Sequence, residues 1–294
     1  MNNWLLLDDY EDKRLPDSFS IVIDAHVHLF PDGVFQAIWR WFDQFAWPIR
    51  YKLTSPQIME FLTSRGVDRI LGLHYAHKPG IARQLNTYMA GLCRDHPKLT
   101  GTATVFPGEK NAVDILKEAF ELGLAGVKLH AHVQYFAMDD PVMHEIYESC
   151  VNYSKPLIMH VGREPKNHGF PYQRDPYETC KADKLERVLK DYPSLKICVP
   201  HLGADEFDQY KRLLEGYDNL WVDTAMVLVD YVPGFKVPKL TELRSDRVMF
   251  GTDFPNIPYA WDTEIRQLGK LQLRDDFLEK ILERNAIEFL STSA

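Results

Sequence analysis

Residues 99–132 read LTGTATVFPGEKNAVDILKEAFELGLAGVKLHAH, a stretch that contains one complete strand–helix–strand pattern. Its two ends, LTGTATVF (99–106) and AGVKLHAH (125–132), are short apolar runs typical of buried strands. The middle has the apolar spacing of a helix whose face packs on a sheet, at Leu116, Ala119, Phe120 and Leu122. The stretch therefore predicts a βαβ unit, in which the two strands run parallel.

The same alternation extends from this unit in both directions. Further strand-like runs lie at 20–28, 68–74, 156–162, 195–203, 220–226 and 247–254. Amphipathic segments separate them, and many stop at Gly or Pro just before the next run, as short connections do. With the two runs above this makes eight strands, which fit a closed barrel or a doubly wound open sheet.

The positions of the polar residues favour the barrel. Strand after strand ends in His, Lys or Asp, and only a barrel brings all the carboxyl ends to one mouth. No Gly-rich phosphate loop follows the first strand, which weakens a dinucleotide-binding interpretation. We therefore expect a single-domain α/β protein, a (β/α)₈ TIM barrel over residues 21–294, preceded by an N-terminal extension at residues 1–20.

Two long insertions interrupt this pattern, at Phe30–Thr54 and at Arg163–Ala182. The first is rich in aromatic residues, namely Phe35, Trp39, Trp41, Phe42, Phe45 and Trp47. It fits a lid over the mouth, an extra helix packed on the barrel, or an interface in a homodimer.

Composition limits the partners and the compartment. The formal net charge of -8 argues against nucleic acid or an anionic membrane as the main partner. No apolar run approaches the ~20 residues of a membrane span. The four cysteines are scattered, and the first residues lack a basic leader, so we expect a cytoplasmic protein with reduced thiols. A small molecule is the expected substrate.

The segment Asp24-Ala-His26-Val-His28 is the first candidate for chemistry. Residues two apart on a strand point to the same side, so the two imidazoles are placed to bind one ion. Asp24 shares their parity and fits either a second shell that orients a ligand or a buried, hydrogen-bonded carboxylate. Alone, an H-x-H pattern is weak evidence.

Three more residues strengthen the evidence for a metal site. His160, His201 and Asp253 each follow an apolar run and stand at the carboxyl end of a predicted strand. Burying five such groups without partners would cost several kcal/mol apiece, roughly, and a metal ion supplies a common partner.

Together, the H-x-H, the two later histidines and Gly251-Thr-Asp-Phe-Pro255 resemble the amidohydrolase superfamily. More narrowly, they resemble the amidohydrolase-related branch that includes aminocarboxymuconate-semialdehyde decarboxylase and uncharacterised barrel hydrolases. The resemblance implies one divalent metal, usually zinc, with manganese, iron or nickel as alternatives. It implies His26, His28, His160 and Asp253 as ligands and His201 as the general acid/base or the histidine that positions the water.

Lys128 and His130 share one face of the run at 125–132. In two-metal relatives a carbamylated lysine on this strand bridges the ions. We instead expect an unmodified Lys128 that contacts a substrate carboxylate or developing negative charge, against the alternative of an ion pair with Asp24 or another carboxylate at the mouth. His130 and Arg163 are candidate substrate contacts, although a loop arginine is as often solvated.

The expected function is hydrolysis of a small amide, lactone or carboxylate-bearing cyclic substrate by a metal-activated water, with Asp253 or His201 as the base. The alternative on the same site is non-oxidative decarboxylation, or hydration, of an unsaturated or aromatic acid. A metal-free lactonase and a non-catalytic ligand-binding barrel are more distant alternatives.

Overall fold

The computed structural model describes residues 10–16, 18–161, 169–229 and 239–291. Its strands are β1 (Ile23–His28), β2 (Arg69–Leu73), β3 (Leu99–Gly101), β4 (Val127–His130), β5 (Leu157–His160), β6 (Ile197–Val199), β7 (Leu220–Asp223) and β8 (Val248–Met249). Each lies inside one of the runs predicted to be strands, so those predictions are confirmed.

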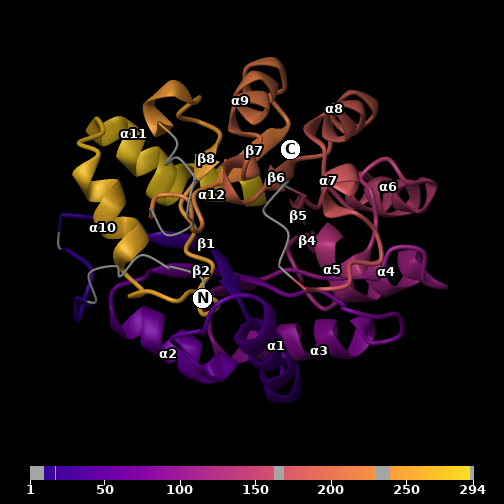
Figure 1. Ribbon diagram of the computed structural model, residues 1–294, viewed down its shortest axis with the longest axis horizontal. Coiled ribbons are helices and arrows are strands. Elements are labelled where there is room, and N and C mark those ends of the chain that lie inside the picture. The colour runs from indigo at the N-terminus through magenta and orange to yellow at the C-terminus, as the bar shows by residue number, and fades with distance from the viewer. Residues whose placement is uncertain (1–9, 17, 162–168, 230–238, 292–294) are drawn as a thin grey trace.

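Helices surround the strands, as Figure 1 shows. They are α1 (Asp32–Phe45), α2 (Ser55–Ser64), α3 (Ala82–Asp95), α4 (Ala112–Glu121), α5 (Ala131–Gln134), α6 (His144–Asn152), α7 (Pro176–Thr179), α8 (Ala182–Asp191), α9 (Phe207–Gly216), α10 (Thr263–Lys270), α11 (Asp275–Glu279) and α12 (Asn285–Leu290). None of the helices in the described ranges is long and apolar enough to cross a membrane.

The strands form a closed barrel. They pair in parallel in chain order, β1 to β3 and β4 to β8. Isolated parallel bridges join the two sets, Ala103 with Val127 and Val27 with Phe254. Backbone hydrogen bonds support both junctions, including His28 N to Phe254 O at 2.8 Å. Because the first and last strands are joined, the predicted TIM barrel is confirmed and the open sheet is excluded.

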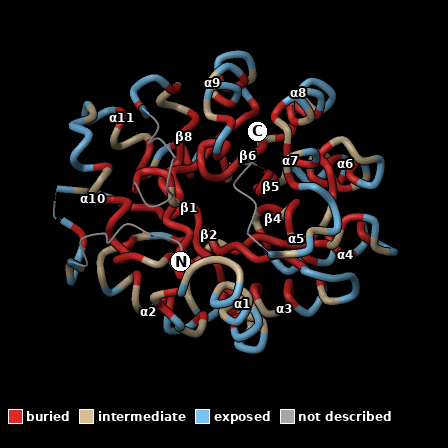
Figure 2. The backbone as a smooth tube through the Cα atoms, in the orientation of Figure 1, coloured by how far each residue is buried: buried red, intermediate tan, exposed pale blue. Residues whose placement is uncertain are grey.

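Apolar side chains pack on both faces of the barrel, inside it and between its strands and the surrounding helices. The outer layer lies between strands and helices and forms the larger cluster. The inner cluster consists mainly of Ile23, Leu71, Ile158, Trp221 and Met249, joined by Ala286 and Phe289 of α12. Figure 2 shows this buried centre and the exposed outer turns of the helices. Because apolar side chains fill the interior, the polar residues of the predicted site lie at the ends of the strands.

In helix α4, three of the four residues of the predicted apolar face are buried. Leu116, Ala119 and Phe120 are buried against the barrel, as predicted. Leu122, predicted to lie on the same face, is 47% exposed. Its backbone is still in the right-handed helical region, but at 3.6 residues per turn it lies to the side of the face that Leu116, Ala119 and Phe120 form. The prediction is wrong for Leu122.

The aromatic insertion after β1 forms α1, which packs on the barrel. Phe35 is fully buried, and its ring lies edge-on to Phe30 with 5.5 Å between centroids. On the outer part of the helix, Trp41 and Phe45 contact Phe170 of the segment that follows β5. The structure shows the extra helix packed on the barrel, while the lid over the mouth and the homodimer interface stay predictions.

Residues before the barrel pack against it. Asp12 N donates to the Asp262 carboxylate at 3.1 Å, and the Trp261 indole donates to the Asp12 carbonyl at 3.1 Å. Leu15 N donates to the Arg65 carbonyl at the end of α2. The domain boundary at residue 20 itself stays a prediction.

Candidate active site

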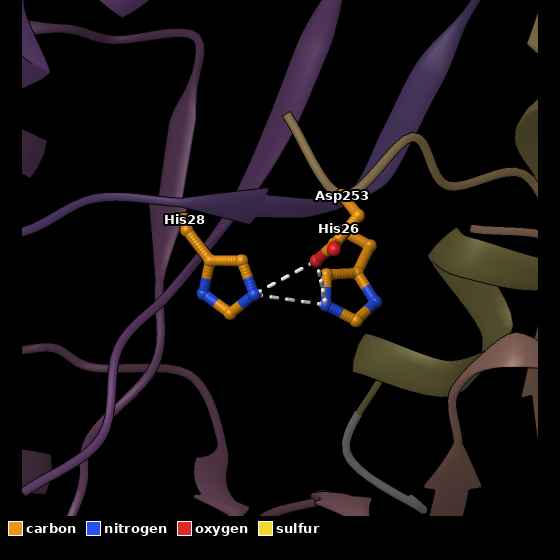
Figure 3. A group of neighbouring side chains, drawn as sticks. All are labelled: His26, His28 and Asp253. Carbon is orange, nitrogen blue, oxygen red and sulfur yellow. Dashed lines mark hydrogen bonds and ion pairs between the residues drawn. The ribbon is translucent and has the colours of Figure 1, made fainter. Parts of the chain in front are cut away.

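The two histidines of β1 lie side by side. Figure 3 shows both rings on the same side of the strand, with 3.3 Å between their Nε2 atoms. A β-bulge between Asp24 and Val27 places two residues of β1 opposite one residue of β2. The alternation of side chains between the two faces of β1 is therefore interrupted at the bulge. Ala25 belongs to the inner apolar cluster, and Asp24 does not.

Asp253 supplies a third candidate ligand from the loop after β8. Its φ of 66° lies in the left-handed region, which Asp adopts more readily than most residues. Its backbone N donates to the His26 carbonyl at 2.9 Å, which ties the loop to β1. Its Oδ1 lies 3.1 Å from His26 Nε2 and 2.9 Å from His28 Nε2, as drawn in Figure 3.

These three atoms fit a single divalent ion. Two ligand atoms at about 2.0–2.1 Å from a tetrahedral ion lie roughly 3.3 Å apart. The separations of 2.9, 3.1 and 3.3 Å are close to that value, and all three side chains are buried. Burial disfavours a charged Asp253, yet hydrogen bonds from His26 and His28 hold its pKa well below the usual value. A converged pair of imidazoles and a carboxylate is a ligand set for zinc or manganese.

Asp24 supports the loop that carries Asp253. It is fully buried and accepts hydrogen bonds from the hydroxyl and backbone N of Thr252 and from the backbone N of His26. Burial raises its pKa to about 7. Of the two roles considered from the sequence, the structure shows the buried, hydrogen-bonded carboxylate, because its contact with His26 is to the backbone and not to the ring.

The carboxylate that contacts the His26 ring is Asp223, at the end of β7. Its Oδ2 lies 2.8 Å from His26 Nδ1, and its Oδ1 accepts from the backbone N atoms of His201 and Ala225. Burial disfavours its charge, but His26 outweighs this and lowers the pKa of Asp223 to about 2. Sequence reasoning assigned it no role. Its one available signal was its place at a strand end.

His201 lies directly after β6 with its orientation set by hydrogen bonds. Its Nδ1 donates to the carbonyl of Ala225 at 2.8 Å, since a carbonyl only accepts. Its Nε2 is left facing the mouth, 3.3 Å from His160 Nδ1. The ring centroid lies 5.3 Å from that of His26. The structure thus brings His201 beside the ligand group, as predicted.

His160 and His130 stack on each other at the ends of β5 and β4. Their rings are nearly parallel, with 3.9 Å between centroids. His160 contacts His201 but, among the described residues, does not join the converged group of His26, His28 and Asp253. Its role as a metal ligand remains a prediction. Burial, followed by the charge of His160, lowers the pKa of His130 well below its usual value.

Lys128 lies at the base of this mouth. Its side chain is fully buried, and Nζ has no hydrogen-bond partner within the described ranges. Burial lowers its pKa to about 8, although Asp223 and Asp253 act in the opposite direction. Within the described part of the chain, Lys128 forms no hydrogen-bonded ion pair with Asp24 or with another carboxylate. Arg163, the other predicted substrate contact, lies outside the described residues.

Tyr75, after β2, was missed by sequence reasoning. It is buried, and its ring packs edge-on against both His28 and His130, with centroid distances of 5.8 and 4.9 Å. It therefore links the ligand group to the stacked histidines. An aromatic residue after an apolar run gives no signal that separates this position from ordinary core.

Glu264, on α10, is a buried carboxyl near the site. Its oxygens accept hydrogen bonds from the Tyr259 hydroxyl at 2.8 Å and from Leu228 N at 3.2 Å. Burial raises its pKa to about 8, although both hydrogen bonds favour the charged form. Glu264 therefore keeps its proton in the folded protein at neutral pH.

Because folding raises the pKa of Glu264, the free energy of unfolding depends on pH. Between 4.5 and about 8 the unfolded chain releases the proton of Glu264 while the folded protein keeps it. The free energy of unfolding should therefore fall as pH rises through this window, by up to about 1.4 kcal/mol per pH unit, and level off above it. We expect Glu264→Gln to remove this component in urea titrations followed by circular dichroism. The exposed Glu121→Gln is the matched control, and equal pH slopes for both variants would contradict the assignment.

Comparison with known proteins identifies the family and supports the fold. A family model described as Amidohydrolase matches residues 23–292. The curated protein 2-amino-3-carboxymuconate-6-semialdehyde decarboxylase of Dictyostelium discoideum is 24% identical over 243 residues. That match covers 71% of this chain and 66% of the relative, so the chain spans just under two thirds of that protein's length.

Solved structures show the same barrel. An uncharacterised TIM-barrel protein from Bordetella bronchiseptica has a TM-score of 0.67 at 20% identity, covering 92% of this chain and 98% of that one. A 5-carboxyvanillate decarboxylase from Novosphingobium aromaticivorans has a TM-score of 0.66 at 18% identity, covering 95% and 98%. The latter was crystallised with manganese and 4-hydroxy-3-methoxy-5-nitrobenzoic acid.

Fold and site thus define a barrel enzyme with a His-His-Asp group suited to a divalent metal. The chain belongs to the amidohydrolase family, as the resemblance predicted, and so to a family of enzymes.

Proposed function

We propose that the protein is a metal-dependent, non-oxidative decarboxylase of a planar unsaturated or aromatic acid. The observation that carries the proposal is the place of His201. It is a buried histidine that lies beside the ligand group without joining it, with Nε2 turned toward the mouth. Decarboxylation needs a proton delivered where carbon dioxide departs, and an independent histidine next to the metal supplies it.

The metal is held by His26, His28 and Asp253, with His160 as the fourth ligand that the family resemblance implies. Zinc is the ion proposed, and manganese, which the related decarboxylase contains, is the alternative. When bound, the ion supplies positive charge that orients and polarises the oxygen atoms of the substrate. A planar acid with a neighbouring oxygen substituent is suited to such binding.

In the reaction, the bond between the ring carbon and the carboxyl carbon breaks, and its electron pair remains on the ring carbon. Carbon dioxide leaves. His201, protonated on both nitrogens, transfers the Nε2 proton to that carbon, while Nδ1–H stays bonded to the Ala225 carbonyl. Solvent returns a proton to Nε2 before the next turnover. The carboxylate and one proton thus become carbon dioxide and a carbon–hydrogen bond.

Lys128 stabilises the negative charge that develops on the substrate. A buried ammonium without a hydrogen-bond partner is costly, and an anionic substrate offsets this cost. His130, stacked on His160, lines the same side and offers a hydrogen bond to the substrate. Arg163 is proposed as a further carboxylate contact on the sequence alone.

The test is the mass of the product formed from a panel of aromatic and muconate-like acids, lactones and small amides. Decarboxylation lowers the substrate mass by one carbon dioxide and, in deuterated water, places one deuterium on the vacated carbon. Hydrolysis of a lactone raises the mass by one water, and hydrolysis of an open-chain amide gives an acid and an amine whose masses add up to that of the amide plus one water. We expect the first result for an acid in the panel. Turnover of lactones or amides with none of the acids would overturn the proposal.

Hydrolysis is the second candidate, and the Amidohydrolase description of the family favours it. In that reaction Asp253 or His201 takes a proton from the attacking water. Both candidates share the ligand group, so the panel above separates them by the product and not by the residues required.

A further inference from the structure

The turn that follows β6 has an uncommon backbone conformation. Residues 201–204 all have positive φ angles, of 58°, 50°, 80° and 54°. Only Gly203 among them is a glycine, and residues with a side chain adopt this region rarely. Ala204, with φ 54° and ψ -124°, is close to the first central position of a type II′ turn, which glycine fills most readily. Backbone strain of this kind persists only where the surrounding structure holds it.

Backbone hydrogen bonds close this turn. Ala204 N donates to the His201 carbonyl at 2.8 Å, and Gly203 N donates to the Pro200 carbonyl at 3.1 Å. The start of the turn is tied to the end of β7, because His201 N donates to Asp223 Oδ1 at 3.1 Å. The strained conformation therefore begins at the residue that faces the mouth.

The middle of the turn packs against Tyr210 of α9. A Cβ atom added to Gly203 would overlap Cδ2 and Cγ of the Tyr210 ring, so only a glycine fits between the turn and the helix. The ring is buried, and its hydroxyl has no hydrogen-bond partner among the residues that the structure describes. Tyr210 thus acts on the turn through its ring.

We infer that Gly203 and Tyr210 are positioning residues, whose close packing holds the strained turn so that His201 keeps Nε2 directed at the mouth. The inference rests on the proposed function, because it concerns the histidine to which proton delivery is assigned. Displacing a reacting group by about 1 Å can lower a rate by roughly 10²-fold. The packing behind the turn therefore affects turnover without any contact with the substrate.

Two substitutions test this packing, and each has a matched control. Gly203→Ala puts a Cβ atom against the ring and should displace the turn. Gly101→Ala is its control, since a Cβ there would lie 2.5 Å from Met89 Cγ, on the side of α3 and not of the turn. Tyr210→Leu removes the ring and keeps an apolar side chain. Its control, Tyr210→Phe, keeps the ring and removes only the hydroxyl.

The first readout is the NMR signal of the His201 ring, in protein whose histidines carry carbon-13 and which has been incubated with zinc. The signal is assigned by its absence from His201→Gln. We expect Gly203→Ala and Tyr210→Leu to shift or broaden it, because the ring loses its fixed orientation. Gly101→Ala and Tyr210→Phe should leave it as in the wild type. If Gly203→Ala does not fold, as judged by circular dichroism, the two variants of Tyr210 still decide.

The second readout is kcat and KM for an acid that the wild-type protein decarboxylates. Gly203→Ala and Tyr210→Leu should lower kcat by about 10–100-fold and change KM by less than about twofold, because they move the proton donor and not the proposed substrate contacts on β4. Both controls should keep kcat within about twofold of the wild type, even where they lower the melting temperature.

The outcomes separate this inference from the proposed function. An unchanged His201 signal in Tyr210→Leu and in folded Gly203→Ala overturns the inference, and so does an equal change in the controls, since the effect is then one of stability alone. A changed signal with wild-type kcat overturns it too, because the orientation of His201 then does not affect the reaction. If the wild type decarboxylates no acid, the proposed function fails, and the NMR comparison still decides whether the two residues orient His201.

Discussion

A double variant, His26→Ala with His28→Ala, is expected to lose both the bound metal and the activity. The substitutions remove two of the three converged ligand atoms, which leaves Asp253 alone. Metal affinity should therefore fall by more than the roughly 10–100-fold that loss of an outer partner costs. The measurement is metal content by plasma mass spectrometry after dialysis, beside an assay of turnover.

The control for this variant is His144→Ala, which changes an exposed histidine at the start of α6. It should keep the metal and the activity of the wild type. Thermal unfolding by circular dichroism shows whether the double variant still folds. A folded double variant that retains a full equivalent of metal would place the ion elsewhere in the protein.

Replacing His201 with glutamine should also remove the activity but should leave the metal bound. His201 lies next to the ligand group and is proposed to deliver the proton, so its loss should lower kcat by about 10²–10⁴-fold. Glutamine keeps a polar amide group near the position of Nε2 but cannot act as a general acid, so the proton is not delivered. Metal content and the rate of product formation are measured on the same sample.

This pair of measurements also distinguishes the number of ions. In a two-metal site His201 would bind the second ion, and His201→Gln would lose about one equivalent of metal together with activity. Activity close to that of the wild type, with metal retained, would remove His201 from the mechanism.

Much of the fold follows from local sequence, for a physical reason. Strands that are covered on both faces are nearly continuous apolar runs, and a βα barrel repeats them between amphipathic helices. The runs that contain His28, His160 and Asp253 therefore predicted the positions of their strands correctly. The polar residue after each run pointed to the mouth, because parallel strands bring their carboxyl ends together.

What the sequence could not show depends on register and on contacts across the barrel. The bulge in β1 places the side chain of Asp24 on a different side of the strand from those of His26 and His28. No residue type in that segment indicates a bulge. Asp223 lies 197 positions from His26, and its partner became evident only in three dimensions. The stacking of His160 on His130 also required the pairing of β4 with β5.

The most direct test of a metal-dependent enzyme is the metal content of the wild-type protein, by plasma mass spectrometry, together with its intact mass. The account predicts about one equivalent of a divalent ion, with an intact mass that shows no carbamate on Lys128. Two equivalents with a carbamylated lysine would contradict the single-ion site. No metal, even after incubation with zinc or manganese, would contradict the proposed mechanism as a whole and leave a metal-free lactonase or a binding protein.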